Sequence, residues 1–276
     1  MLKRILLGLG GTEYTPCAVR HAVDIARRHG ASVTGVTVVD LARLDRVGPV
    51  PVGAGKFAQD LREHRVKVAY EHVAQASEEF ARACDAASIG FQLLREEGGA
   101  LDLMISQSRY YDLIIFGLRS LFEYDFVADP CETLVRLVSH GVRPILAVAP
   151  EYRDVRRVLI AYSGSMESAK SMRRFAQLRL WPDAQCRVVT FQQGATSEGA
   201  KLPQDAAAYC RAHGFNVEED FVEGSAKAGI LPYAVEWNAD LIVIGNSARS
   251  VLLKKVFGDT AKNAIRKADR PLFLCQ

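Results

Sequence analysis

The residues best suited to chemistry follow a short apolar run in the last quarter of the chain. Gly245 comes directly after the apolar run 241–244, and Gly258 precedes the helical pattern 261–267. Glycines at these places would let a phosphate group approach backbone N–H groups and the positive end of a helix dipole. The pattern therefore predicts a phosphate-binding loop. Further donors in this segment are Arg249, Ser250 and Thr260.

The same residues also have a purely structural interpretation. Gly245 would end the strand tightly, and Asp259 or Thr260 would be the N-cap of the following helix. Asp259 also opposes a phosphate, since a carboxylate about 4 Å away at an effective dielectric of about 20 costs about 4 kcal/mol. A bridging cation such as Mg²⁺, an Asp259 side chain turned away as the cap, or a ligand less charged than ATP would each resolve this conflict.

No other pattern predicts a catalytic or metal site. The six histidines lack HExxH or paired spacing, and we interpret them as surface or helix-end residues. The six cysteines form no CxxC pair and are expected to be reduced and buried. Ser163 and Ser165 lack a Gly-x-Ser-x-Gly context and an evident base. We expect no catalytic residue, and a weak ATPase at most.

Two glycine-rich segments resemble phosphate loops only in part. The segment 8–11 follows an apolar run but lacks the third glycine of a dinucleotide-binding loop. The segment 53–56 ends in Gly-Lys, but Val50 stands where the first glycine is required and Phe57 where Ser or Thr would bind Mg²⁺. We therefore interpret 53–56 as a flexible turn.

An internal repeat identifies the elements that must position these loops. Three segments recur in the same order, and the first copy is lengthened by an insert near 41–65. The repeat predicts two domains, 1–150 and 154–276, joined by a polar stretch that contains a proline. The matched pairs are 4–12 with 157–165, 111–117 with 239–245, and 143–148 with 270–275.

Within each copy, apolar runs alternate with helical patterns. Strands apolar on both faces and separated by helices indicate an α/β class, with parallel sheets covered on both sides in a doubly wound arrangement. Ligands of such sheets bind beyond the carboxyl ends of the strands. The expected strands are 5–9, 32–39, 91–95, 113–116 and 145–148, then 158–162, 186–191, 216–222, 241–244 and 272–275; helices expected in the first copy include 66–87, 100–108 and 132–139.

Along nearly its whole length, apart from the insert, the sequence resembles the universal stress protein family, in its tandem two-domain form. The resemblance lies in the opening strand and its loop, in Ala239-Asp240 with the apolar run that leads to Gly245, and in the family spacing Gly-x2-Gly-x9-Gly-Ser/Thr. Here Ala248 and Asp259 replace the second glycine and the hydroxyl residue of that motif. The resemblance implies tandem Rossmann-like domains of the adenine nucleotide alpha hydrolase type.

The resemblance also implies a nucleotide site, holding ATP, ADP or AMP, in the second domain. Ser163 stands where the family has an aspartate that contacts the adenosine part, and a serine can still hydrogen-bond a ribose hydroxyl. Thr190 and Phe191 end the second strand of that domain, beside the expected adenine. The complete expected set is Ser163, Gly164, Ser165, Thr190, Phe191, Gly245, Arg249, Ser250, Gly258, Asp259 and Thr260.

The first domain departs further from the family pattern. After Gly117, the positions of the motif glycine and hydroxyl residue hold Pro130 and Cys131, and proline removes a backbone donor where a phosphate would bind. The opening aspartate is replaced by Gly10. This phosphate loop is therefore interpreted as degenerate, with loops that serve packing or another ligand.

Composition and resemblance together limit the expected partners. A net charge of +3, from 35 basic and 32 acidic residues, gives no case for nucleic acid, and no run of about 20 apolar residues suits a membrane helix. We expect a cytoplasmic regulator of stress responses. The last strands, 145–148 and 272–275, are expected to pair antiparallel between the two domains, or in a homodimer. The alternatives are an interaction scaffold without nucleotide, or a slow ATPase or other small-ligand enzyme.

Overall fold

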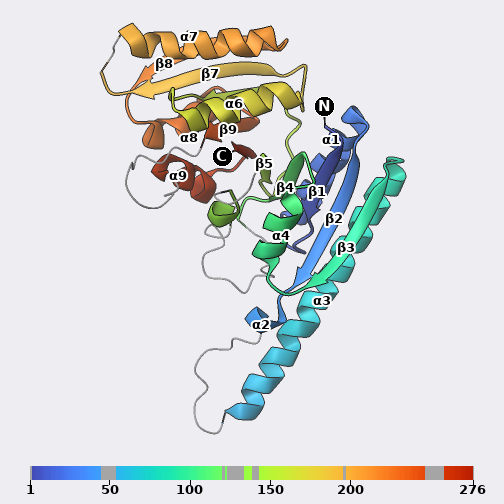
Figure 1. The fold of residues 1–276 in the computed structure, drawn as a ribbon. Coiled ribbons are helices and arrows are strands. Elements are labelled where there is room, and N and C mark those ends of the chain that lie inside the picture. Colours follow the sequence, from blue (N-terminus) through green and yellow to red (C-terminus); the bar gives the residue numbers. More distant parts are fainter. Residues whose placement is uncertain are drawn as a thin grey trace.

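A single mostly parallel sheet runs through the whole molecule (Figure 1). The computed structural model describes residues 2–44, 54–119, 122, 134–138, 143–194, 197–245 and 258–275. Within these residues the sheet has ten strands in the order β3-β2-β1-β4-β5-β10-β9-β6-β7-β8. The strand order reverses direction between β1 and β4, and again between β6 and β9, as in a doubly wound fold.

The N-terminal half of the sheet alternates strands with helices. Its strands agree with the expected ones to within two residues at each end. Four of them, β1, β2, β4 and β5, are largely buried on both faces, whereas the outer strand β3 has several exposed positions. Of the helix expected at 132–139, residues 134–138 are helical and the rest lie outside the described residues. The elements are β1 (Arg4–Gly8), α1 (Thr15–His29), β2 (Ser32–Val39), α2 (Leu41–Leu44), α3 (Gly55–Ala86), β3 (Phe91–Glu97), α4 (Ala100–Ser108), β4 (Leu113–Gly117) and β5 (Ile145–Val148).

The C-terminal half repeats this order without a long insert after its second strand. Its two outer strands, β7 and β8, are parallel neighbours, as β2 and β3 are in the N-terminal half. The elements are β6 (Arg157–Ala161), α6 (Met166–Leu178), β7 (Gln185–Gln192), α7 (Ser197–Ala212), β8 (Asn216–Glu223), α8 (Ala226–Glu236), β9 (Leu241–Gly245), α9 (Asp259–Lys267) and β10 (Leu272–Cys275).

Helices cover both faces of the sheet. Side chains from α1, α6, α7 and the C-terminal part of α3 pack on one face, and side chains from α4, α8 and α9 pack on the other. Strand β1 shows how the pleat divides the core, because Ile5 and Leu7 point to the first face and Leu6 to the second. Both layers of buried side chains continue from one half of the sheet into the other.

The two halves join through their last strands. β5 and β10 pair antiparallel, with Phe273 opposite Leu146, so the expected pairing within the chain is confirmed. Each of these strands also has a parallel neighbour on its other side, β4 for β5 and β9 for β10. Both hydrogen-bonding edges of β5 and β10 are therefore occupied. A homodimer through these strands stays a prediction, and it would have to form without further hydrogen bonds to β5 or β10.

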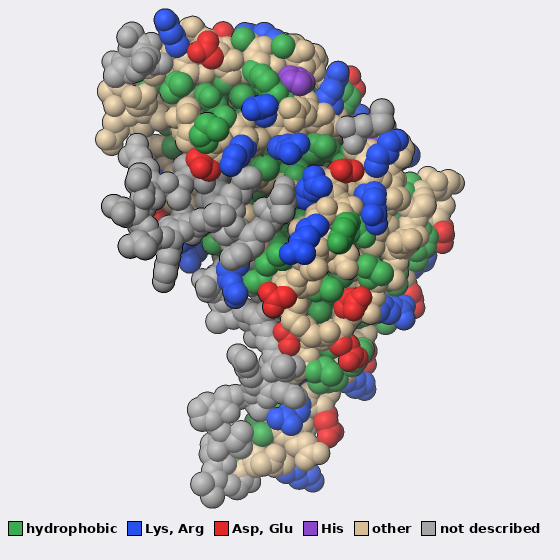
Figure 2. All heavy atoms as spheres, in the orientation of Figure 1, with side chains coloured by type: hydrophobic (Ala, Val, Ile, Leu, Met, Phe, Trp, Pro, Cys, Tyr) green, Lys and Arg blue, Asp and Glu red, His purple; other side chains and the backbone are tan. Residues whose placement is uncertain are grey.

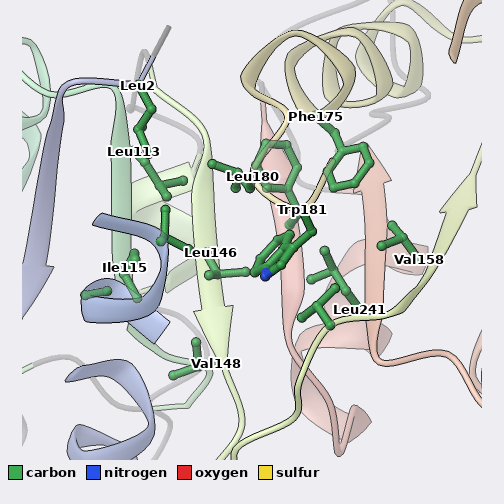
Figure 3. Packing of buried hydrophobic residues seen from close by; sticks show 14 of the residues in the cluster. Leu2, Leu113, Ile115, Leu146, Val148, Val158, Phe175, Leu180, Trp181 and Leu241 are labelled. Carbon is green, nitrogen blue, oxygen red and sulfur yellow. The ribbon is translucent and has the colours of Figure 1, made fainter. Parts of the chain in front are cut away.

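A tryptophan from the C-terminal half reinforces this joint. Trp181 follows α6 and is 6% exposed. Figure 3 shows its indole ring between Leu146 of β5 and Leu241 of β9, with Leu180 beside it. Trp181 is therefore a core residue at the joint between the two halves.

One repeated sequence feature has a structural cause. Asp112 accepts hydrogen bonds from the backbone N–H groups of Lys3 and Arg4 at 2.8 and 3.0 Å. Asp240, its counterpart in the second copy, accepts from the N–H groups of Arg156 and Arg157 at 2.9 and 2.8 Å. In each half the aspartate holds the start of the opening strand beside the strand that the aspartate precedes. The repeated Asp-Leu-Ile sequence therefore serves the fold.

We expect Asp240→Ala to lower the free energy of unfolding by about 2 kcal/mol, because it removes the acceptor of two charge-assisted hydrogen bonds. Urea denaturation measures the loss, with Asp240→Asn as the control that keeps one acceptor oxygen. If Asp240→Ala and Asp240→Asn are both as stable as the parent, the carboxylate does not hold the strand.

The insert has more regular structure than the sequence indicates. α3 begins at Gly55, whereas the sequence predicts its start near Val66, and its first turns project beyond the sheet (Figure 1). The expectation of a flexible turn at 53–56 is wrong for Gly55 and Lys56, which lie in the first turn of this helix. Gly55 is tolerated there because the first residues of a helix donate few intrahelical hydrogen bonds.

Surface charge and hydropathy add two observations. On the face shown in Figure 2, Lys and Arg side chains are mixed with Asp and Glu over both halves of the molecule. Among the described helices, none combines the length and the apolar character that crossing a membrane requires. The expectation that the chain does not bind nucleic acid stays a prediction.

Candidate functional site

Three serines form a hydrogen-bonded cluster where β6 leads into α6. Ser163 Oγ lies 3.1 Å from Ser165 Oγ and 3.3 Å from Ser168 Oγ. Ser165 is the N-cap of α6, and its hydroxyl accepts from the backbone N–H of Ser168 at 3.2 Å. Gly164 between them has φ +75°, a conformation that glycine adopts without strain. The cluster presents neutral hydroxyls at the carboxyl end of the opening strand.

The start of α6 is fixed to the neighbouring strands. Ser171 Oγ donates to the backbone oxygen of Cys275, at the end of β10, at 3.1 Å. A Cβ atom on Gly245, at the end of β9, would lie 2.5 Å from the backbone nitrogen of Ser168 and 2.6 Å from the carbonyl carbon of Glu167. The backbone of Gly245 therefore packs directly on the first turn of α6. The structure brings Ser163, Gly164, Ser165 and Gly245 together in this way.

The glycine after β4 makes the matching contact in the N-terminal half. A Cβ atom on Gly117 would lie 2.6 Å from Cβ of Tyr14, the N-cap residue of α1. Gly117 and Gly245 occupy the same place in the two copies of the repeat. Helix packing is therefore a sufficient physical reason for a glycine at both positions.

The two opening loops differ in exposure. After β6, Ser163, Gly164 and Met166 are exposed, and Met166 is 69% exposed. At the matching positions after β1, Gly10 is buried and Gly11 is partly buried, although Glu13, which matches Met166, is exposed. The C-terminal half thus has an open carboxyl edge at its first strand, and the N-terminal half has a closed one.

Large side chains close the edge in the N-terminal half. The ring of Phe122, 3% exposed, packs over Gly8, where an added Cβ would lie 3.5 Å from Phe122 Cζ. On the opposite side of the loop, a Cβ on Gly11 would lie 2.7 Å from Cβ of His72 in α3. The side chains of Phe122, His72 and the buried Tyr14 therefore occupy the place where a doubly wound sheet holds its ligand.

The start of α9 differs from the sequence prediction. Gly258 is the N-cap, with φ −65° and ψ 141°, and Asp259 is the first helical residue. The interpretation of Asp259 or Thr260 as the N-cap is therefore wrong, because the helix begins one residue earlier. Asp259 is exposed, and a carboxylate in the first turn is favourable to the helix dipole. Asn263 holds α9 against α8 by donating to the carbonyl of Lys227 at 2.9 Å.

Thr190 and Phe191 lie just before the last residue of β7, and their side chains are engaged in the fold. Thr190 is 1% exposed, and its hydroxyl donates to the carbonyl of Tyr162 at 2.9 Å. The Phe191 ring meets Tyr233 edge-on at 5.9 Å, and a Cβ on Gly229 would lie 2.4 Å from that ring. Contact between the adenine and this strand would therefore have to come from its backbone or from the exposed part of Phe191.

Arg249 and Ser250 lie outside the described residues. Arg119, two residues after Gly117 in the other half, serves the fold. Its guanidinium donates to the carbonyls of Arg266 and Ala268 at 3.0 and 3.1 Å, and to the Tyr14 hydroxyl at 3.3 Å. Arg119 thereby caps the C-terminus of α9, as a cation there should. The expectation that this loop serves packing or another ligand stays a prediction, and the contacts of Arg119 are of the packing kind.

The described residues supply a hydrogen-bonding site more readily than a reactive one. Burial raises the pKa of the Cys17 thiol to about 12 and that of Cys84 to about 11, which keeps both protonated and unreactive. Among the described residues, no cluster of three or more His, Cys, Asp or Glu side chains could hold a metal ion. Ser168 is the member of the serine cluster that the sequence interpretation missed, although it lies three residues after Ser165, where the hydroxyl of an N-cap serine accepts a backbone N–H.

Comparisons with known proteins agree with this architecture. The universal stress protein family profile matches residues 1–142 and 190–276. Universal stress protein Slr1230 of Synechocystis sp. is 24% identical over 288 residues, covering 98% of this chain and 99% of the relative. A crystal structure of a universal stress protein from Archaeoglobus fulgidus covers 99% of this chain and 96% of its own, with a TM-score of 0.67 and 16% identity. Protein PA1789 of Pseudomonas aeruginosa, described as functionally unknown, has a TM-score of 0.58 and 15% identity, covering 99% of this chain and 92% of its own.

Proposed function

The chain belongs to the universal stress protein family, and from this premise we propose that it is a stress-response regulator that binds one adenine nucleotide in its C-terminal domain. The proposed domains are 1–150 and 154–276. The observation that carries the proposal is the difference between the two opening loops. Ser163 and Gly164 are exposed, whereas their counterparts Gly10 and Gly11 are buried and partly buried, with His72 packed against Gly11.

The serine cluster supports recognition of the ribose. Ser163 and Ser165 hydroxyls can each donate and accept, and they already bond to one another at 3.1 Å, so exchanging that bond for one to a ribose hydroxyl leaves no polar atom unsatisfied. The packing of Gly245 on the first turn of α6 fixes the position of the cluster. The proposed site is therefore preorganised for a neutral, hydroxyl-bearing ligand group.

The N-terminus of α9 supports recognition of the phosphates. Gly258 is its N-cap in an extended conformation, and the first N–H groups of a helix are favourable to an anion. Asp259 is exposed in the first turn and adds a negative charge there. We therefore propose that AMP binds more tightly than ATP in the absence of a divalent cation, and that Mg²⁺ improves the binding of ATP.

An interaction scaffold without nucleotide is the second candidate. The observation in its favour is that Gly117 and Gly245 both have a sufficient reason in helix packing, so these two motif glycines need no phosphate to explain them. Such a scaffold would keep the fold of the family while the nucleotide site is lost.

Release of bound small molecules tests the proposal directly. The purified full-length chain is denatured and the supernatant is chromatographed, and we expect about one adenine nucleotide per chain. Thermal shifts with ATP, ADP and AMP, each with and without Mg²⁺, measure binding to chains that were purified empty. A chain that is empty and shows no shift with any of these compounds favours the scaffold. Turnover of ATP is measured in parallel, and the proposal expects none above that of the variant described next.

We expect Gly258→Asp to weaken AMP binding at least about 10-fold while the protein stays folded. The backbone angles at Gly258 suit any residue, and aspartate is among the best N-caps, so the substitution adds a charge at the phosphate position with little cost in stability. Isothermal titration measures the change in affinity.

Gly99→Asp is the matched control, because Gly99 is the N-cap of α4 and is likewise extended, with φ −68° and ψ 98°. It should leave AMP affinity unchanged. Equal affinities of the two variants would place the nucleotide away from α9, even if the released-nucleotide experiment shows that one is bound.

A further inference from the structure

A buried histidine lies where three segments of the molecule meet. His21 is in the middle of α1 and is 1% exposed. The linker 149–156, which connects β5 with β6, and the junction loop 179–184, which connects α6 with β7, both pack on this part of α1. The interpretation of His21 as a surface or helix-end residue is wrong, because these two segments cover it.

Aromatic rings enclose the imidazole. The Tyr152 ring of the linker lies 4.6 Å from the His21 ring, tilted by 37°. The Trp181 ring of the junction loop meets it edge-on at 6.4 Å. His21 Nε2 is buried and has no hydrogen-bond partner in the described part of the chain. A neutral imidazole tolerates this apolar enclosure far better than a protonated one does.

The charged groups around His21 come from each of the three segments. On α1, Asp24 accepts a hydrogen bond from the Tyr152 hydroxyl at 2.6 Å, and the Arg20 guanidinium lies 3.7 Å from the centre of the Tyr152 ring. Asp154 of the linker attracts a proton on His21 and Arg20 opposes one. The junction loop has two ionic groups: Asp183 is exposed and 4.0 Å from Arg28, and the Arg179 guanidinium lies 6.0 Å from the centre of the Phe215 ring.

Burial is the dominant influence on His21. It lowers the pKa of the imidazole to about 4, with Asp24 and Asp154 counteracting and Arg20 adding to the effect. In the unfolded chain the same group titrates near 6.5. Because the unfolded state takes up the proton first, stability falls as the pH decreases from about 6.5 to about 4, and the loss is complete below that range.

We propose that His21 is an acid-sensitive latch between the two halves of the protein, which holds the linker and the junction loop on α1 while it is neutral and releases them when it is protonated. Protonation places a positive charge among Tyr152, Trp181 and Arg20, on a side chain that is only 1% exposed. When Trp181 and Tyr152 move away, the imidazolium becomes exposed to solvent, and the free-energy cost of burying its charge is removed. The latch thereby links acidification to looser packing of the two halves.

The fluorescence emission of Trp181 reports whether the latch is closed, because the emission shifts when the indole ring becomes exposed to solvent. The chain has two tryptophans, so Trp237→Phe leaves Trp181 as the reporter. In this background, emission of Trp181 is recorded between pH 7 and 4, and melting temperature is measured at pH 7 and 4.5. We expect a red shift with a midpoint between about pH 4 and 6.5. We also expect the melting temperature to fall about 5 °C more than in the same protein carrying His21→Phe.

His29→Gln is the matched control. His29 is on the same helix and contacts the same loop, with Nε2 3.3 Å from the carbonyl oxygen of Leu180, but it is only partly buried. The emission change should persist in His29→Gln and disappear in His21→Phe. If His21→Phe does not fold, His21→Gln provides a smaller group that does not titrate. A parent protein without the emission change, or a His21 variant that keeps it at the same midpoint, overturns the proposal.

Discussion

Trp181→Ala is expected to lower the free energy of unfolding by about 4 kcal/mol, and the melting temperature by about 10 °C. The reason is its place at the joint: the ring is 6% exposed and lies between β5 of one half and β9 of the other. Truncation would leave a cavity bordered by Leu146 and Leu241, which belong to rigid strands and cannot close over it. Urea denaturation monitored by circular dichroism measures the loss.

Trp237→Ala is the control for this substitution. Trp237 is half-buried at the end of α8, and the Arg187 guanidinium lies 4.8 Å from its ring centre. Its truncation removes less buried surface, so we expect a loss of about 2 kcal/mol. Equal losses in the two variants would mean that the joint does not depend on the Trp181 ring.

Gly245→Ala has the second largest expected effect, a loss of about 3 kcal/mol in the free energy of unfolding. The added Cβ would lie 2.5 to 2.6 Å from backbone atoms of Glu167 and Ser168. Backbone atoms cannot rotate out of the way as a side chain does, so the first turn of α6 must move away from β9. The serine cluster moves with that turn, and we expect nucleotide binding to weaken in the same variant.

Gly90→Ala is the control that shows whether the loss of stability in Gly245→Ala comes from the contact between Gly245 and α6. Gly90 precedes β3, its φ is not in the left-handed region, and an added Cβ there has no neighbour within 4 Å. We expect its stability to stay within about 0.5 kcal/mol of the parent. Thermal and urea denaturation compare the free energies of unfolding of the two variants. A Gly245→Ala protein as stable as Gly90→Ala would contradict the argument that Gly245 packs on the first turn of α6.

Much of the fold follows from the sequence. β2, β5, β10 and α4 have the predicted bounds, because runs such as Ile145–Val148 are apolar on both faces and end at prolines, glycines or charged residues. The bounds of these elements depend on local pattern, and local pattern is what a sequence displays. The antiparallel pairing of the last strands, which is confirmed, was implied by the resemblance to the universal stress protein family.

The remaining features depend on contacts between distant residues. In the sequence, a glycine such as Gly245 after a strand is expected both in a phosphate loop and where a helix packs closely on the strand end. Only the position of Ser168 in the structure shows the close helix contact. A lone histidine such as His21 is usually exposed, and its burial comes from Tyr152 and Trp181, more than a hundred residues away along the chain. The occupation of the first opening loop by Phe122 likewise has no local sign.

The antiparallel pairing of β5 with β10 affects how the two halves of the protein can diverge in evolution. In a symmetric dimer of identical subunits, every substitution changes both copies, so a bulky residue that closes one site closes its twin. Here the two halves are parts of one polypeptide joined by its own central strands. A mutation can therefore fill the first loop, as Phe122 does, and leave the second open, which frees one half to specialise as support for the other.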